Sequence, residues 1–194
     1  MAEPELPQVG EYSPRAQLLA GALLGVIFII LWFVSGGLGW PSGWFVISVG
    51  LGAVLLTLAA FDMHAHILPD LLTLPLLLAG LLVNGLWPIS LLWAAIGAAS
   101  GYGLIAGLRW LWLRRTGVEA IGLGDAKLLA AGGAWVGAAG LPIVLLVASS
   151  TGLAAALLGG SYFKDKALPF GVFLALGVWV SWCFWVTPLM MGLL

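Results

Sequence analysis

The sequence predicts an all-α fold, that of a polytopic helical membrane protein, and three observations carry this prediction. Of the 194 residues, 62% are hydrophobic and 8% are charged, whereas a soluble globular domain carries roughly 25% charged residues. The apolar residues form long continuous runs and lack the alternating pattern of membrane-barrel strands. The 28 glycines follow no G-X-Y period, so they indicate close packing of helices instead of collagen.

The composition also excludes several classes of protein. A net charge of -1 leaves no basic surface of the kind that nucleic-acid binding needs, so we expect the lipid bilayer and not a nucleic acid as a partner. The single cysteine, Cys183, excludes a disulfide framework and a zinc site built from cysteines.

The chain begins with a polar stretch. Residues 1–16 are rich in glutamate and proline and precede a long apolar run. A secretory signal starts instead with a basic region and a short apolar core, so we expect the first apolar segment to be retained as a span. The predicted organisation is a polar N-terminal tail at 1–16 and one transmembrane domain at 17–194.

A bilayer core about 30 Å thick takes roughly 20 helical residues to cross. Counting apolar runs between Gly, Pro and charged residues predicts about seven transmembrane helices, with six to eight as the range, at 17–36, 43–61, 71–87, 89–113, 125–139, 141–160 and 169–190. The fifth is short, because residues 125–139 would measure about 22 Å at 1.5 Å per residue. The start of the third is open: Pro75 kinks a helix that begins at Leu71 but fits the first turn of one capped by Thr73, which would place residues 63–72 along the interface.

The basic residues indicate the orientation. All lie before the first span or around the 4/5 and 6/7 connections: Arg15, Arg109, Arg114, Arg115, Lys127, Lys164 and Lys166. Because Lys and Arg accumulate on the cytoplasmic side, we expect a cytoplasmic N-terminus and cytoplasmic 2/3, 4/5 and 6/7 connections.

Glycines four residues apart are candidates for close contact between helices. The pairs are Gly21 and Gly25, Gly97 and Gly101, Gly103 and Gly107, and Gly133 and Gly137.

Two aspartates are the candidate catalytic residues. Asp62 ends the second predicted span and Asp125 opens the fifth, and the two spans between them return the chain to the same face. An ionised Asp at mid-depth costs on the order of 3 kcal/mol, so such residues face a polar cavity or one another, although each alone also fits an ordinary helix end in the headgroup zone. If the helix ends are neighbours, the carboxylates form a coupled pair. One then draws a proton from water while its protonated partner polarises a peptide carbonyl.

Gly122 and Gly124 precede Asp125, and residues without Cβ let a substrate backbone come close; a flexible loop is the alternative interpretation. His64 and His66, together with Asp62 and Asp70, could also be read as a transition-metal site. We expect no metal, because the chain has no other histidine and both suit a wet interface.

Three blocks of the sequence resemble the type IV prepilin peptidases, which are membrane aspartic proteases of the GxGD type. The blocks are Phe61-Asp62 with Leu68-Pro69-Asp70-Leu71-Leu72-Thr73-Leu74-Pro75-Leu76-Leu77, Gly80 and Asn84; Gly122-Leu123-Gly124-Asp125-Ala126-Lys127-Leu128-Leu129; and Leu168-Pro169-Phe170-Gly171. They run in the family's order from about residue 45 to 180.

The resemblance implies cleavage of the basic leader of prepilins or pseudopilins, after a glycine, at the cytoplasmic face of a bacterial inner membrane. It implies that Asp62 and Asp125 are catalytic. Motif positions that support the site or bind substrate are Asp70, Gly122, Gly124, Lys127, Pro169, Phe170 and Gly171.

The sequence departs from the family's longer members, which carry a domain with two Cys-x-x-Cys pairs between their first two spans. Here residues 36–43 occupy that position, so the short form is expected to lack that domain and its zinc. Methylation with S-adenosylmethionine is therefore in doubt, and cleavage itself needs no cofactor.

Two other functions remain open. An ion- or proton-coupled transporter would use Asp62, His64, His66 and Asp70, although we find no internal repeat of the kind that transporters show. A presenilin-like protease, which cuts inside the bilayer, also uses aspartate in a GxGD context.

Overall fold

The computed structural model describes residues 14–36, 39, 42–86, 90–118, 122–159 and 168–186, in which there are helices and connections but no strand. The helices are α1 (Pro14–Val34), α2 (Ser42–Ala65), α3 (Asp70–Leu86), α4 (Leu91–Thr116), α5 (Leu123–Gly159) and α6 (Phe170–Ser181), and α6 continues into a π-helical turn, η3 (Trp182–Val186). Four helices are long and apolar enough to cross a membrane, and the segments Asp70–Leu86 and Phe170–Val186 are shorter apolar helices. The all-α polytopic membrane fold is confirmed. Of the predicted tail, residues 1–13 lie outside the described part, and α1 already begins at Pro14.

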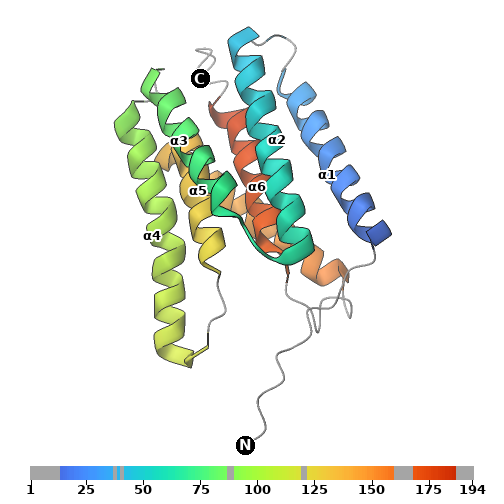
Figure 1. Ribbon diagram of the computed structural model, residues 1–194, viewed down its shortest axis with the longest axis vertical. Helices are drawn as coiled ribbons and strands as arrows, with labels where there is room; N and C mark the ends of the chain where they lie inside the picture. The colour runs from blue at the N-terminus through green and yellow to red at the C-terminus, as the bar shows by residue number, and fades with distance from the viewer. Residues whose placement is uncertain are drawn as a thin grey trace, which may run out of the picture.

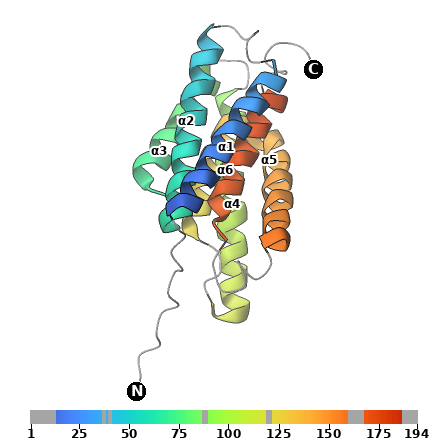
Figure 2. The ribbon, with the colours of Figure 1, turned by 90° about the vertical axis from the view of Figure 1, so that its right-hand side faces the viewer.

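The helices run alternately up and down (Figure 1). α1 rises from its blue lower end, α2 descends beside it, α3 rises and α4 descends. α5 rises, turns back on itself and descends behind the others, and α6 rises to the upper end (Figures 1 and 2). The start of α1 therefore shares one end of the bundle with residues 66–69 and with the start of α5, as the alternation of spans predicts.

The fifth and sixth predicted spans form one element with a break in it. Gly137 has φ 68° and ψ 175°, which interrupts the helical backbone of α5 close to the expected junction at 139–141. This combination of angles is accessible almost only to glycine, because a Cβ would clash with the backbone. The first part, residues 123–136, measures about 21 Å, as its length in sequence predicts.

α3 begins earlier than the alternative with a Thr73 cap requires. Asp70 is its first residue, Pro75 lies inside it, and the Thr73 hydroxyl donates to the carbonyl oxygen of Pro69 over 3.3 Å. Helix α2 continues to Ala65, so only residues 66–69 connect the two helices. The prediction that residues 63–72 lie along the interface is wrong, and the first-turn hydrogen bonds of α3 to Pro69 explain the early start.

Glycine allows the closest helix contact, between α4 and the first part of α5. A Cβ at Gly97 would meet the carbonyl oxygen of Gly133, and one at Gly101 would meet that of Leu129. The backbones therefore approach closely there, which stabilises helix pairs in lipid, where no hydrophobic effect drives helices together. The pairs Gly21 and Gly25, and Gly103 and Gly107, have no atom within 4 Å of such a Cβ, so the prediction that they pack helices is wrong.

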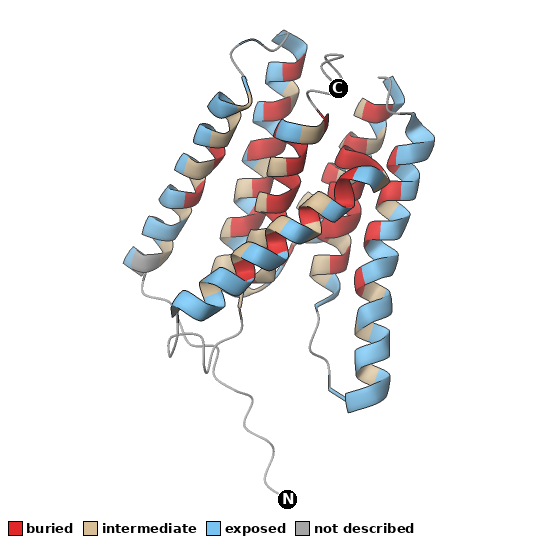
Figure 3. Ribbon diagram, turned by 180° about the vertical axis from the view of Figure 1, so that it is seen from behind, coloured by how far each residue is buried: buried red, intermediate tan, exposed pale blue. Residues whose placement is uncertain are grey.

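Burial separates the inner from the outer helices (Figure 3). Five leucines of the inner helices are fully buried. They are Leu55 and Leu58 of α2, Leu128 and Leu129 of α5, and Leu174 of α6. α1 packs mainly on α2 and little on α6, and it exposes large apolar side chains such as Leu18 and Leu19. An apolar outer surface around an apolar core is what lipid as the solvent requires.

Candidate functional site

Asp62 lies in the last turn of α2 and is the one acidic residue among the buried polar residues of the described part. Its side chain is 5% exposed. The backbone N–H groups of Gly171 and Val172, in the first turn of α6, approach its carboxylate, while Oδ2 has no hydrogen-bond partner among the described residues. A buried oxygen that keeps an unused lone pair is suited to bind water or a substrate.

Gly171 makes this approach possible. A Cβ at this position would lie 2.8 Å from Oδ2 and 3.0 Å from Cγ of Asp62. Any side chain here would therefore push α6 or the carboxylate aside. The glycine of the third block thus has a direct steric reason in the structure.

Leu68 joins the second and third blocks. A Cβ at Gly124 would lie 3.2 Å from Cβ of Leu68, and one at Gly171 would lie 3.2 Å from its Cδ1. The Leu68 side chain is therefore wedged between the start of α5 and the start of α6. Leu68 is not among the predicted site residues, although it stands beside Pro69 and Asp70 in the first block.

Asp125 lies in the first turn of α5 and is half-buried. Gly124, which precedes Asp125, contacts the same Leu68 side chain as Gly171, which contacts Asp62, so the two aspartates lie near each other. A Cβ at Gly122 would lie 3.9 Å from Oδ2 of Asp125, so the preceding glycine leaves space beside this carboxylate. The structure therefore brings together the two aspartates that the sequence analysis placed at one face.

α2 and α5 meet in this region largely through other elements. α2 packs mainly on α6 and α1, whereas α5 packs on α4, α6 and α3. The start of α6 and residues 66–69 contact both helix ends and thereby hold the two aspartates near each other.

Asp70 and Lys127 form an ion pair between the first turns of α3 and α5. Nζ of Lys127 lies 2.6 Å from Oδ1 and 2.8 Å from Oδ2 of Asp70. Lys127 is two residues beyond Asp125, so the pair holds the start of α5 against the connection that follows Asp62.

Pro169 precedes the first residue of α6, and its carbonyl oxygen accepts from the N–H of Val172 over 3.3 Å. Phe170 is half-buried and packs against the core. Nδ1 of His64 lies 2.9 Å from the carbonyl oxygen of Ala60 in its own helix. His64 is exposed. Of the basic residues that indicate the orientation, Lys164 and Lys166 lie outside the described part.

The fold and the site define a polytopic helical membrane protein with an acidic pair at one end of its bundle. A model of the type IV leader peptidase family matches residues 49–157. The chain belongs to this family. The match contains both aspartates and the Asp70–Lys127 pair.

Curated relatives cover more of the chain. A prepilin leader peptidase/N-methyltransferase of Burkholderia pseudomallei (strain 1026b) is 43% identical over 174 residues, which are 87% of this chain and 53% of the relative. Proteins of the same name are 45% identical in Aeromonas hydrophila, over 66% of this chain and 46% of the relative, and 35% identical in Neisseria gonorrhoeae, over 86% and 56%. The chain spans about half the length of the curated relatives it matches. No solved structure matches it.

Proposed function

We propose that this protein is an aspartic endopeptidase that removes the leader peptide of type IV prepilins or pseudopilins, after a glycine, at the cytoplasmic face of a bacterial inner membrane. The observation that carries the proposal is the pair of neighbouring aspartates, of which Asp62 is the one buried charged residue in the described part of the chain and Asp125 is half-buried. The names of the relatives support the choice of substrate.

In the proposed reaction the ionised aspartate takes a proton from water, and the water oxygen adds to the scissile carbonyl carbon. The protonated aspartate donates a hydrogen bond to the carbonyl oxygen, which carries the developing negative charge. When the C–N bond breaks, the leaving nitrogen takes the proton that the first aspartate received from water and departs as an amine, and the carbonyl of the new carboxyl group re-forms. The reaction uses water and two carboxylates and needs no cofactor.

The glycines beside the acids fit this chemistry. Because Gly171 and Gly122 have no side chain, the space beside the carboxylates of Asp62 and Asp125 stays open. An extended peptide backbone can then reach both carboxylates without being held off by a Cβ.

The proposed cytoplasmic location rests on the basic residues. Arg15 lies in the first turn of α1, and Arg114 and Arg115 lie in the last turn of α4. Figure 1 shows these two helix ends on the same side of the bundle as the start of α5, and Lys and Arg accumulate on the cytoplasmic side of membranes. An acidic site at this face also attracts a basic leader electrostatically.

The test incubates membranes that contain the Asp62→Asn or the Asp125→Asn variant with a prepilin substrate. We expect each variant to lose cleavage by about a thousand-fold or more, because each removes one of two groups that act together. Glu5→Gln, in the polar stretch before the first predicted span, is the matched control and is expected to cleave at the wild-type rate. Cleavage at the wild-type rate by either aspartate variant would contradict the two-aspartate mechanism.

The transporter alternative has less support from the geometry. Asp70 is engaged by Lys127, and the His64 ring contacts a carbonyl of its own helix. Two of its four proposed polar residues are thus already engaged away from Asp62.

A further inference from the structure

The structure has an apolar groove between α2 and α3. Its volume is about 410 Å³. It is lined by Leu51 and Val54 of α2, by Leu72, Ala79 and Val83 of α3 and, at its back, by Trp135 of α5. Figure 1 shows the two helices diverging upward from their connection, residues 66–69.

The walls of the groove run along α2 and α3 toward the acidic pair. On α2, Leu51 and Val54 share one helical face with Leu58 and Asp62, since these positions follow one another at steps of three or four residues. On α3, Leu72 is the lining residue nearest the connection, and its N–H donates to the carbonyl oxygen of Pro69. Both walls therefore lead to residues 66–69, whose Leu68 contacts Gly124 and Gly171 beside the aspartates.

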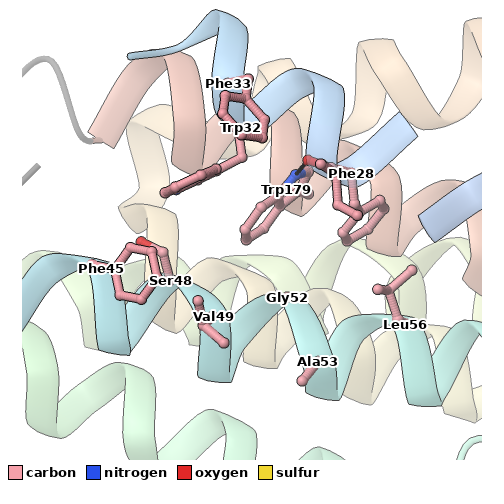
Figure 4. Close-up of a pocket in the computed structure, with 11 residues that line it drawn as sticks. Phe28, Trp32, Phe33, Phe45, Ser48, Val49, Gly52, Ala53, Leu56 and Trp179 are labelled. Carbon is pink, nitrogen blue, oxygen red and sulfur yellow. Dashed lines mark hydrogen bonds between the residues drawn. The ribbon is translucent and has the colours of Figure 1, made fainter. Parts of the chain in front are cut away.

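A second apolar cavity lies on the opposite face of α2 (Figure 4). It has a volume of about 350 Å³ and is bounded by Phe28, Trp32, Val49 and Trp179 of α1, α2 and α6. The ring of Trp179 stacks on that of Phe28 at a centroid distance of 5.1 Å, and its Nε1 donates to the carbonyl oxygen of Phe28. None of its lining residues belongs to α3 or to the connection at 66–69, so no wall of this cavity leads to the segment that contacts Gly124 and Gly171.

We infer that the groove between α2 and α3 binds the apolar helix of the substrate, with the end of that helix directed toward Asp62 and Asp125. The inference rests on the proposed function. Because both walls lead toward the acidic pair, an apolar substrate segment in the groove would bring the adjoining cleavage point toward Asp62 and Asp125. The chemistry agrees, because the groove walls are apolar and an amphipathic or apolar helix binds such a groove through its apolar side chains.

The first test fills the groove and compares two substrates. Val54→Trp narrows the groove, and the matched control Val49→Trp places the same side chain on the opposite face of the same helix. The substrates are a full prepilin, with its apolar helix, and a short soluble peptide that spans the cleavage point. For Val54→Trp we expect the KM for the full substrate to rise about ten-fold or more while cleavage of the short peptide is unchanged. Val49→Trp is expected to resemble wild type with both.

A second variant guards against loss of folding. Gly50→Phe also enters the groove, and a Cβ at Gly50 has no atom within 4 Å, so the fold has room for it. The same loss of the full substrate alone is expected. Equal losses with both substrates, or an unchanged KM in both groove variants, would overturn the inference.

The third measurement does not depend on cleavage. A photo-crosslinking amino acid replaces Ala79, inside the groove, or Leu78, which is 58% exposed on the same helix. We expect a crosslink to the full prepilin from position 79 and none from position 78, and the crosslink should persist in the Asp62→Asn background. Crosslinks to lipid alone at position 79 would contradict the inference, whereas absence of cleavage by the unsubstituted chain would refute only the proposed function.

Discussion

Gly171 fixes how closely α6 approaches Asp62. Because a Cβ here would lie 2.8 Å from Oδ2, the Gly171→Ala variant must shift either the carboxylate or the helix start. We expect cleavage to fall between about ten- and a hundred-fold, since small displacements of a catalytic group have effects of this size. The measurement is the rate of prepilin processing in detergent micelles.

Gly103→Ala is the matched control, because a Cβ there has no atom within 4 Å. It should cleave at the wild-type rate and unfold at the same or a slightly higher temperature, since alanine favours a helix over glycine by about 0.5–1 kcal/mol. Equal activity of Gly171→Ala and the control would show that the approach of α6 to Asp62 is unimportant for cleavage.

The Asp70–Lys127 ion pair is a second residue-scale test. Its side chains are 55% and 36% exposed, so it contributes about 0–1 kcal/mol to stability. We therefore expect Asp70→Asn and Lys127→Gln to lower cleavage clearly while the unfolding temperature changes little. The double exchange Asp70→Lys with Lys127→Asp should restore part of the activity if the pair positions the start of α5. Single variants that process prepilin normally would exclude this role.

At the scale of elements, the break in α5 is stabilised by Asn84. Its Nδ2 donates to the carbonyl oxygens of Ala134 and Trp135 over 2.6 and 3.1 Å. The break at Gly137 deprives these carbonyls of their usual helical donors four residues on. Nε1 of Trp135 in turn donates to the carbonyl oxygen of Leu76, so α3 holds the broken segment at two points.

Gly137→Ala should therefore destabilise the protein. The new Cβ conflicts with φ 68° and ψ 175°, at a cost of about 1–3 kcal/mol. Asn84→Leu should destabilise by a similar amount, because two buried carbonyls would lose their donor. Thermal unfolding in detergent measures both, with Gly107→Ala, an open position, as the control. An unchanged unfolding temperature for both variants would contradict this account of the break.

The elements differ in how far the sequence predicts them. Long apolar runs predicted every described helix within a few residues, because lipid allows few alternatives to a continuous helix. The alternation of spans also predicted that Asp62 and Asp125 share one end. The wedge of Leu68 between Gly124 and Gly171, and the contact of Asn84 with Ala134, could not be predicted, because both depend on how distant segments pack.

At the scale of the whole molecule, α4 indicates how deep the acids lie. Its lower end extends beyond the start of α5 (Figures 1 and 2). There Trp110 and Trp112 are 54% and 50% exposed, and the guanidinium of Arg114 lies 4.1 Å from the centroid of the Trp110 ring. Tryptophan and basic residues concentrate where membrane meets water. We therefore expect the headgroups near this end of α4 and the aspartates deeper than the headgroup level.

The orientation of the bundle can be tested with single cysteines. Cys183 is the single cysteine of the sequence, so the Cys183→Ala variant is a background without thiols. Gly39→Cys, between α1 and α2, and Val118→Cys, after α4, are exposed at opposite ends of the bundle. If basic residues mark the cytoplasmic side, a membrane-impermeant maleimide should label position 39 in intact spheroplasts and position 118 only after permeabilisation. The reverse pattern would place Asp62 and Asp125 at the outer face, where a basic leader held in the cytoplasm does not reach them.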